Sequence, residues 1–260
     1  MYPELIHLDS IILRSYGLLI ALAIAISFAT GLILFRKQGL PLEEGLRSGL
    51  FMLFGAVAGA RLMYVFMHWD RFATGLDSIL KISGGGMIYW GGVTGCVLAL
   101  WIYSGIRSSY FWRLGDTWAP AAAFGIAVGW IGCLLAGCCY GLPTNGPLAI
   151  TFHDTASLAP VGTPLYPTQV YYVMAEVTII CVVLWLRDRK KFEGQVFLWY
   201  LILEANASLL VERYRGDFRG QVFGMNMSPG QFLATLILIG AVIALLIKAR
   251  NKLPRKTPSN

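Results

Sequence analysis

Charged side chains lie inside long apolar segments of this chain, and they are the first sign of chemistry. Arg61 stands in Gly-Ala-Arg-Leu within one such segment, and Glu176 and Glu204 lie inside two later ones. Glu212 and Arg215 close the segment that holds Glu204. A charge held away from water is costly and is usually functional. For Arg61 two interpretations stay open, namely an anion-binding role and a buried ion pair that only locks helices together.

Three of the five cysteines fall close together, at Cys133, Cys138 and Cys139. Neighbouring arginines could lower the pKa of Cys138 or Cys139 and make one of these thiols a nucleophile, although simple packing is the plainer interpretation. No metal site is expected from this pattern, because no histidine and no further Cys-x-x-Cys lies nearby. A disulfide framework is not expected either, because the cysteines lie within or beside apolar segments.

The composition is typical of a membrane protein. Of the 260 residues, 57% are hydrophobic and 13% are charged, and the mean hydropathy is +0.63. A soluble domain carries about 25% charged residues. The net charge of +7 comes from short clusters of Lys and Arg between apolar blocks. This distribution sets the orientation of a membrane protein, so nucleic acid is not expected as a partner.

Seven apolar segments are long enough to cross a membrane as helices, which takes about 20 residues each. They cover residues 15–35, 47–67, 84–104, 117–139, 168–187, 194–213 and 229–248. Three of them carry Gly-xxx-Gly pairs, which indicate close helix packing, at Gly55/Gly59, Gly91/Gly95 and Gly125/Gly129. The sequence therefore predicts an all-α polytopic membrane protein with about seven transmembrane helices. We expect a single transmembrane domain over residues 1–248 and a basic cytoplasmic tail over 249–260.

Lys and Arg are shared unevenly between the connections of these spans. They are frequent after the first, third, fifth and seventh spans, as in the Arg-Asp-Arg-Lys-Lys stretch at 187–191, and sparse in the other connections. The basic side of a membrane protein faces the cytoplasm. The N-terminus is therefore predicted outside and the C-terminus inside.

This orientation brings the unusual residues to one leaflet. Arg61 falls in the outer half of the second span. Five further segments place polar, Gly or Cys residues at their outer ends, around Tyr16, Tyr89 to Gly92, Cys138 to Gly141, Gln169, and Glu212 to Arg215. A random scatter would divide these features between the leaflets. We therefore predict a site that is open to the outer leaflet, where arginines can bind a lipid phosphate.

The same segments resemble the prolipoprotein diacylglyceryl transferase family, from about Tyr16 to the last span. The first matching pieces are Ser-Tyr-Gly-Leu at 15–18, Gly-Ala-Arg-Leu at 59–62 and Gly-Met-Ile-Tyr-Trp-Gly-Gly at 86–92. The later ones are Ile-Gly-Cys at 131–133, Gly-Cys-Cys-Tyr-Gly at 137–141, Tyr-Pro-Thr-Gln at 166–169 with Tyr171 and Glu176, Leu-Val-Glu at 210–212 and Arg-Gly-Asp at 215–217. Each piece is short, and their order, spacing and common leaflet carry the resemblance.

The resemblance implies a reaction in the bacterial inner membrane. Enzymes of this family take the diacylglyceryl group from phosphatidylglycerol, a membrane lipid, and attach it as a thioether to the lipobox cysteine in the signal peptide of a prolipoprotein. Glycerol phosphate is released. No metal and no soluble cofactor is implied. Such a site must bind a phosphate, activate a thiol and orient both.

The resemblance also implies roles for individual residues. Arg61 and Arg215 would bind the phosphate, and Glu212 would position an arginine or a water. Tyr16 would hydrogen-bond at the reacting centre, and Gln169 would help to hold the fourth and fifth spans. The remaining residues of the implied substrate site are Tyr89, Gly91, Gly92, Cys138 and Gly141.

Four positions depart from the family pattern. Trp90 stands where the family usually has a histidine before Gly-Gly, although some members have a tyrosine there and Tyr89 is adjacent. Trp130 and Ser208 each replace an arginine. Cys133 stands where an asparagine is common, and a branch of the family has cysteine at this point. Replacing an arginine fork by Trp or Ser removes its bidentate contacts.

Compensating residues and other functions stay open. Glu204 and Asn206 add polar groups that the family pattern does not require, and His153 in the 142–167 connection is either a replacement base or a solvated loop residue. That connection lacks Lys and Arg and is either a lid or a plain surface loop. The departures would also fit a diverged paralogue that binds or transfers lipid without this activity. A transporter is the third class, which inverted repeats would favour, and no clear repeat is found.

Overall fold

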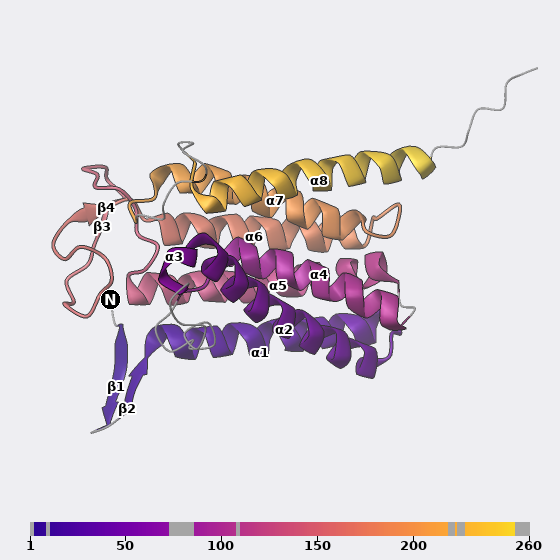
Figure 1. Ribbon diagram of the computed structural model, residues 1–260, viewed down its shortest axis with the longest axis horizontal. Coiled ribbons are helices and arrows are strands. Elements are labelled where there is room, and N and C mark those ends of the chain that lie inside the picture. The colour runs from indigo at the N-terminus through magenta and orange to yellow at the C-terminus, as the bar shows by residue number, and fades with distance from the viewer. Residues whose placement is uncertain are drawn as a thin grey trace, which may run out of the picture. The chain divides into compact units, whose positions relative to one another are not determined.

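The computed structural model describes residues 3–8, 11–72, 86–107, 110–217, 222 and 227–252. Within these ranges the chain is mainly helical (Figure 1). Its long helices are α1 Ser15–Lys37, α2 Leu42–Met67, α4 Tyr89–Arg107, α5 Phe111–Ala136, α6 Thr168–Arg187, α7 Gln195–Val211 and α8 Pro229–Lys252. Each predicted span falls on one of them, so the prediction of an all-α polytopic fold is confirmed.

The short elements are a helical turn, a 3-10 helix and two small hairpins that the sequence analysis did not predict. They are α3 Trp69–Phe72, η3 Glu212–Tyr214, the pair β1 Glu4–Leu8 and β2 Ile11–Arg14, and the pair β3 Ile150–Thr151 and β4 Pro164–Leu165. Strands of two to five residues leave too weak an alternation of polar and apolar residues to be recognised from sequence.

Six of the described helices are long and apolar enough to cross a membrane. The remaining long helix, α7, has 17 residues and passes directly into η3, which places it at the lower limit of a spanning helix. The predicted fourth span reaches residue 139, whereas α5 ends at Ala136 because Gly137 adopts φ +75°. Residues 253–260 of the predicted tail lie outside the described residues.

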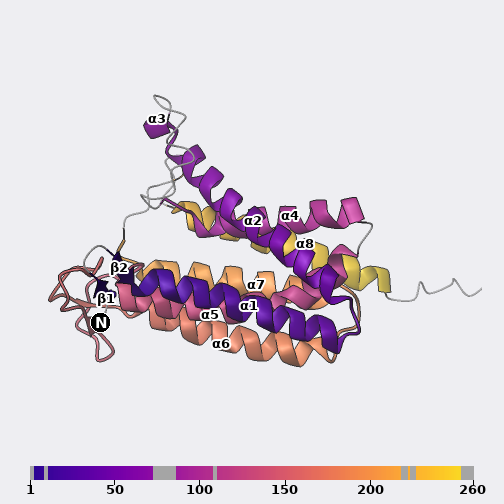
Figure 2. The same ribbon diagram turned by 90° about the horizontal axis from the view of Figure 1, so that it is seen from below.

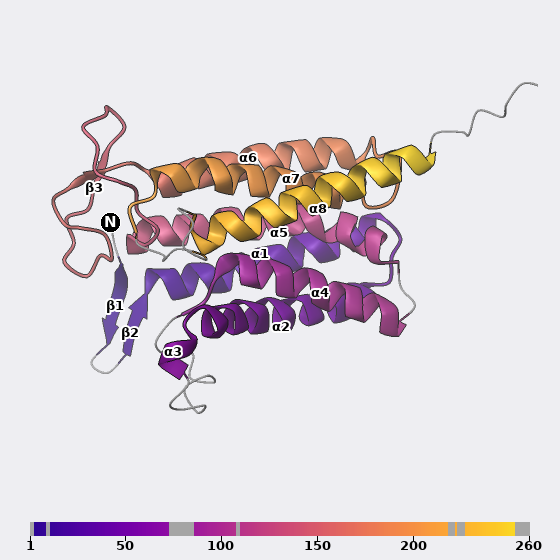
Figure 3. The ribbon, with the colours of Figure 1, turned by 45° about the horizontal axis from the view of Figure 1, so that its top comes forward.

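The chain forms two compact units. The first comprises Met1–Thr30 and Asp116–Asn260, and the second comprises Gly31–Gly115. In the second unit α2 and α4 lie side by side (Figure 3). A Cβ atom on Gly59 would clash with the carbonyl oxygen of Gly91, and one on Gly95 would clash with that of Gly55. The predicted packing role of these two Gly-xxx-Gly pairs is confirmed.

In the first unit α7 packs against α6 and α8 (Figure 3), and α1, α5, α6 and α7 run along one another (Figure 2). Gly125 of the third Gly-xxx-Gly pair lets α5 approach α1, since a Cβ atom there would lie 3.0 Å from the carbonyl oxygen of Ala23. Phe28 of α1 and Trp118 of α5 add an edge-to-face contact with ring centroids 5.6 Å apart. These contacts pack α5 against α1.

The start of α7 is fixed by a buried carboxylate from another helix. Asp116, near the start of α5, is 1% exposed and accepts hydrogen bonds from the backbone N–H groups of Gly194 at 2.9 Å and Phe197 at 3.0 Å. The ammonium of Lys190 lies 2.8 Å from the same carboxylate. The first N–H groups of a helix have no partner within it, and a negative charge there is favourable. Asp116 therefore serves as an N-cap supplied from outside the helix.

We expect Asp116→Ala to lower the unfolding temperature of the detergent-solubilised protein. Each of the two backbone N–H groups left without an acceptor costs about 1–3 kcal/mol. Asp188→Ala is the matched control, because that carboxylate is exposed and its ion pair with Arg187 is long, at 3.9 Å. Equal unfolding temperatures for the two variants would contradict the capping role.

Candidate functional site

Three chain segments meet at one end of the first unit: the turn after α5, the residues before α6 and the residues after η3. Gly216 N–H donates to the Tyr140 carbonyl at 2.9 Å, and Leu142 N–H donates to the Tyr214 carbonyl at 2.8 Å. A Cβ atom on Gly216 would lie 2.5 Å from the carbonyl oxygen of Gly141, and one on Gly141 would clash with that of Tyr166. This three-segment junction therefore has room only for glycine at its two contact points.

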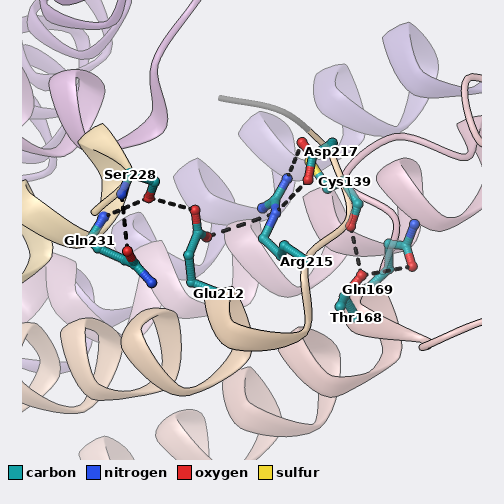
Figure 4. Close-up of polar contacts among 8 residues, drawn as sticks. All are labelled: Cys139, Thr168, Gln169, Glu212, Arg215, Asp217, Ser228 and Gln231. Carbon is teal, nitrogen blue, oxygen red and sulfur yellow. Dashed lines mark hydrogen bonds and ion pairs between the residues drawn. The ribbon is translucent and has the colours of Figure 1, made fainter. Parts of the chain in front are cut away.

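The turn that leaves α5 carries two cysteines and is held through its own carbonyl groups. Gly137 and Cys139 have φ values of +75° and +58°, and Cys139 is the one non-glycine residue with positive φ among those described. Thr168 Oγ1 donates to the Cys139 carbonyl and Gln169 Nε2 to the Cys138 carbonyl, both at 2.7 Å. Because Thr168 and Gln169 are buried, they fix the turn from the first residues of α6 (Figure 4).

A line of polar contacts runs from α8 to the junction (Figure 4). Ser228 Oγ donates to Glu212 Oε1 at 2.8 Å, and Glu212 Oε2 lies 3.8 Å from Arg215 Nε. The guanidinium of Arg215 in turn donates through Nε and Nη2 to the two carboxylate oxygens of Asp217, at 2.9 and 2.7 Å. Gln231 closes the line by accepting from the Ser228 N–H at 3.0 Å. The sequence placed Glu212 and Arg215 together, and the structure brings them into one network.

Arg215 is a buried cation with two carboxylates beside it. Its side chain is 3% exposed, against 7% for Glu212 and 23% for Asp217. Burial lowers the pKa of Arg215. Cys139 and the carboxylates of Asp217 and Glu212 raise that pKa by more than burial lowers it, so the net shift is upward and the guanidinium stays charged. The Asp217 pair uses two of the five guanidinium donors. The geometry thus holds a guanidinium, a group that binds phosphate oxygens, in one orientation between two carboxylates.

Two of the departures from the family pattern lie around one tyrosine. Trp130 of α5 stacks on Tyr172 of α6, with ring centroids 3.7 Å apart and planes within 1°. Tyr172 also lies within hydrogen-bonding reach of Ser208 in α7 and of Arg215. An aromatic pair and a hydroxyl therefore occupy the places where the resemblance implies arginines. Arg215 keeps a polar neighbour on this side.

Tyr16 and the three neighbouring cysteines gather beside this network. Tyr16, in the first turn of α1, is 44% exposed and interacts electrostatically with Cys133, Cys138 and Cys139. The three Sγ atoms lie within 4.8 Å of one another. A hydrogen bond to Cys133 lowers the pKa of the Cys138 thiol, but one to Cys139 and burial raise it more, and the net shift is upward. That shift disfavours the interpretation of Cys138 as a free nucleophile.

The second unit holds the other predicted site residues. Arg61 is 8% exposed, donates from Nη1 to the Gly86 carbonyl at 3.1 Å, and lies 5.6 and 5.4 Å from the ring centroids of Tyr64 and Phe72. Tyr89, Gly91 and Gly92 begin α4. A Cβ atom on Gly91 would clash with Met63 of α2, so close packing alone requires glycine there. The expected convergence of these residues with Arg215 on one leaflet stays a prediction.

Glu176 and Glu204 lie away from the junction. They are 1% and 2% exposed, in α6 and α7, and their side chains are hydrogen-bonded to each other. Asn206, the other extra polar group of α7, donates to the Ile202 carbonyl of its own helix at 2.7 Å. These groups therefore serve contacts within and between α6 and α7.

The 142–167 connection is a small folded cap rather than an open loop. The β3–β4 pair encloses a core of Phe152, Ala159 and Leu165, and the Leu158 N–H donates to the Ala136 carbonyl at 3.2 Å. His153 on this cap is exposed, as expected for a solvated loop residue.

Asp217, Ser228 and Thr168 are the polar residues that sequence reasoning passed over as site residues. Both Asp217 and Thr168 lie within motifs that match the family. The available signal for Asp217 was its position two residues after an arginine, and for Thr168 it was a hydroxyl at the start of a helix. Ser228 precedes Pro229 at the start of α8. Nothing in its sequence neighbourhood points to Glu212.

Helices of membrane-spanning length with a buried polar network at one end are typical of a multi-pass membrane protein. The chain belongs to the prolipoprotein diacylglyceryl transferase family, whose model matches residues 3–247. It is similar to phosphatidylglycerol–prolipoprotein diacylglyceryl transferase 2 of Clostridium perfringens, with 32% identity over 231 residues and 88% of each chain covered. It is also similar to the phosphatidylglycerol–prolipoprotein diacylglyceryl transferases of Clostridium tetani (28% identity, covering 92% of this chain and 94% of the relative) and Mannheimia succiniciproducens (30% identity, covering 95% and 93%).

We expect Gly141→Ala to destabilise the protein, because its Cβ atom would overlap the Tyr166 carbonyl while neighbouring backbone hydrogen bonds hold the segments in place. Overpacking of this kind costs about 1–3 kcal/mol. The unfolding temperature in detergent measures the effect. Gly146→Ala is the control, since its Cβ atom would meet only Thr144 Oγ1 at 3.4 Å. A Gly141→Ala variant as stable as this control would disprove the packing constraint.

Proposed function

We propose that this protein transfers the diacylglyceryl group of phosphatidylglycerol to the lipobox cysteine thiol of prolipoproteins, at the outer leaflet of the bacterial inner membrane. The observation that carries the proposal is family membership over residues 3–247. The names of the relatives give the same donor and acceptor. The uneven distribution of Lys and Arg supports the orientation, with the C-terminus in the cytoplasm.

The reaction is a displacement at carbon. The thiol sulfur of the prolipoprotein attacks the glycerol carbon that carries the phosphate ester, a C–S bond forms and the C–O bond breaks. The bonding electrons leave with the phosphate, so negative charge grows on glycerol phosphate in the transition state. A fixed cation beside the leaving oxygen stabilises that charge. Arg215 is the candidate for this role, and Arg61 is the second.

Glu212 and Asp217 hold the Arg215 guanidinium in one orientation before substrate arrives. Asp217 binds two of its donors and Glu212 approaches Nε at 3.8 Å. A cation that is already oriented need not be ordered during the reaction. Glu212 is itself anchored by Ser228. Tyr16 is the hydrogen-bonding group proposed at the reacting centre, next to the cysteine-bearing turn that Gln169 holds.

Small and aromatic residues are proposed to bind phosphatidylglycerol and the signal peptide. Cys138 and Gly141 on the turn after α5, and Tyr89, Gly91 and Gly92 at the start of α4, are proposed for this part of the site. Glycines there would let lipid or peptide backbone approach closely.

The test is complementation of a bacterium whose own transferase is depleted, read out as growth and as lipid labelling of a reporter lipoprotein. The wild-type chain should restore both. Arg61→Ala should reduce labelling by about 100-fold or more, the usual effect of removing a group that stabilises developing charge. Glu212→Ala should reduce labelling to a similar extent, because Arg215 would lose a group that orients it. Arg213→Ala is the control, because that arginine is exposed.

Membrane-inserted wild-type chain without labelling would overturn the proposed function and favour the diverged paralogue. Full labelling by both alanine variants would instead overturn the assignment of Arg61 and Glu212 while leaving the function in place. Western blots of membrane fractions separate both results from poor expression.

Arg215→Lys should keep the positive charge and lose the two parallel hydrogen bonds from the guanidinium to Asp217. Lysine is a point charge and cannot make the paired contact with Asp217. Because a hydrogen bond to a charged group contributes about 1.5–3 kcal/mol, we expect kcat to fall by about 10- to 100-fold. Transfer to a lipobox peptide, measured in detergent with phosphatidylglycerol, checks this. An unchanged kcat for Arg215→Lys would rule out a requirement for the paired guanidinium–Asp217 contact.

A further inference from the structure

Cys133, Cys138 and Cys139 bring three sulfur atoms together at the reacting end of the first unit. Their Sγ atoms all lie within 4.8 Å of one another, and within the described part of the chain this group includes no histidine and no carboxylate. Cys133 comes from the last turns of α5, and the other two come from the turn that follows. Sequence spacing alone argued against a metal, because neither a histidine nor a second Cys-x-x-Cys is near. The folded turn supplies the proximity that the spacing hides.

The distances between the three Sγ atoms suit a cation that prefers sulfur ligands. A zinc ion with sulfur ligands at about 2.3 Å in tetrahedral geometry requires sulfur atoms about 3.8 Å apart. The three thiols would therefore each need to close by at most about 1 Å. Three protein ligands leave the fourth tetrahedral position open, which is the pattern of catalytic rather than structural zinc.

The turn is built to hold this arrangement. Cys139 adopts φ +58°, a conformation that non-glycine residues adopt only when their surroundings impose it. The carbonyls of Cys138 and Cys139 are each held by a buried side chain of α6, at 2.7 Å. Outer contacts of this kind orient the ligands of a metal site. Arg215 interacts electrostatically with Cys139 and would offset the excess negative charge of three thiolates.

We propose that Cys133, Cys138 and Cys139 bind a zinc ion whose fourth ligand is the thiol of the prolipoprotein. The inference rests on the proposed function and addresses its missing base. Trp90 stands where the family resemblance places a histidine, and the polar network drawn in Figure 4 contains no histidine. A thiol that coordinates zinc is deprotonated outright and stays nucleophilic. The metal would thus perform the activation step.

The step balances without an oxidant or reductant. The substrate thiol releases its proton to solvent on binding zinc, and the resulting thiolate attacks the glycerol carbon of phosphatidylglycerol. The C–O bond breaks and its electron pair leaves with glycerol phosphate. The thioether product is a weaker zinc ligand than a thiolate and dissociates, which frees the fourth position. Tyr16 interacts electrostatically with all three cysteines.

The first experiment measures metal binding by the full chain, purified in detergent and incubated with Zn²⁺ alone. We expect about one tightly held zinc ion per chain, with three sulfur neighbours by X-ray absorption spectroscopy. Cys139→Ser and Cys133→Asn should lose it, and the asparagine variant introduces the residue common in the family, so it should fold. Cys96→Ser/Cys181→Ser, which alters the two remaining cysteines, is the matched control. Zinc binding that is absent from wild type, or kept by Cys133→Asn, overturns the proposal.

The second experiment adds a lipobox peptide to the zinc-loaded protein. The sulfur count should rise from three to four, and a peptide with serine in place of cysteine should leave it unchanged. An unchanged count with the cysteine peptide overturns the activation role. In the same preparation, transfer activity that survives complete zinc removal overturns the metal inference and keeps the proposed function. Zinc-loaded protein that binds the peptide thiol but transfers no lipid overturns the proposed function and keeps the metal site.

Discussion

The candidate site depends on one close contact between backbones. Gly141 and Gly216 meet where the turn after α5, the approach to α6 and the exit from η3 are hydrogen-bonded through their peptide groups. Peptide hydrogen bonds across segments leave little freedom in direction or distance. Arg215 and Asp217 flank Gly216, and the cysteines precede Gly141, so their relative positions follow from this contact. A side chain at either glycine would separate the groups that the proposed chemistry requires together.

The helices could be predicted from sequence because each is a long apolar run of membrane length. Their ends were less predictable, as α5 shows, where a single left-handed Gly137 stops the helix before Cys138 and Cys139. The hairpins were missed because their strands are too short for a pattern to form. Candidate site residues such as Glu212 could be predicted because a charged residue is conspicuous in or beside a long apolar segment.

Partners of those residues were harder to predict than the residues themselves. Ser228 contacts Glu212 from 16 positions away, and nothing in local spacing indicates such a pair. The carbonyls of Cys138 and Cys139 are held by side chains about 30 residues later, at distances that only the folded turn reveals. The three Sγ atoms likewise lie within 4.8 Å of one another across a turn in which Gly137 and Cys139 have positive φ, and local spacing does not give that distance. Backbone conformation at turns is the information that the sequence pattern lacked.

The stack of Trp130 on Tyr172 restricts how this sequence can change. Tyr172 is 3% exposed, and Ser208 lies within reach of its hydroxyl. An arginine introduced at position 130 alone would lose the ring contact and bring a second cation toward Arg215 without a new counter-ion. An arginine at 208 alone would have to enter a buried space sized for a serine. Single substitutions toward the common family pattern thus pass through less stable proteins, so the two positions are expected to change together or not at all.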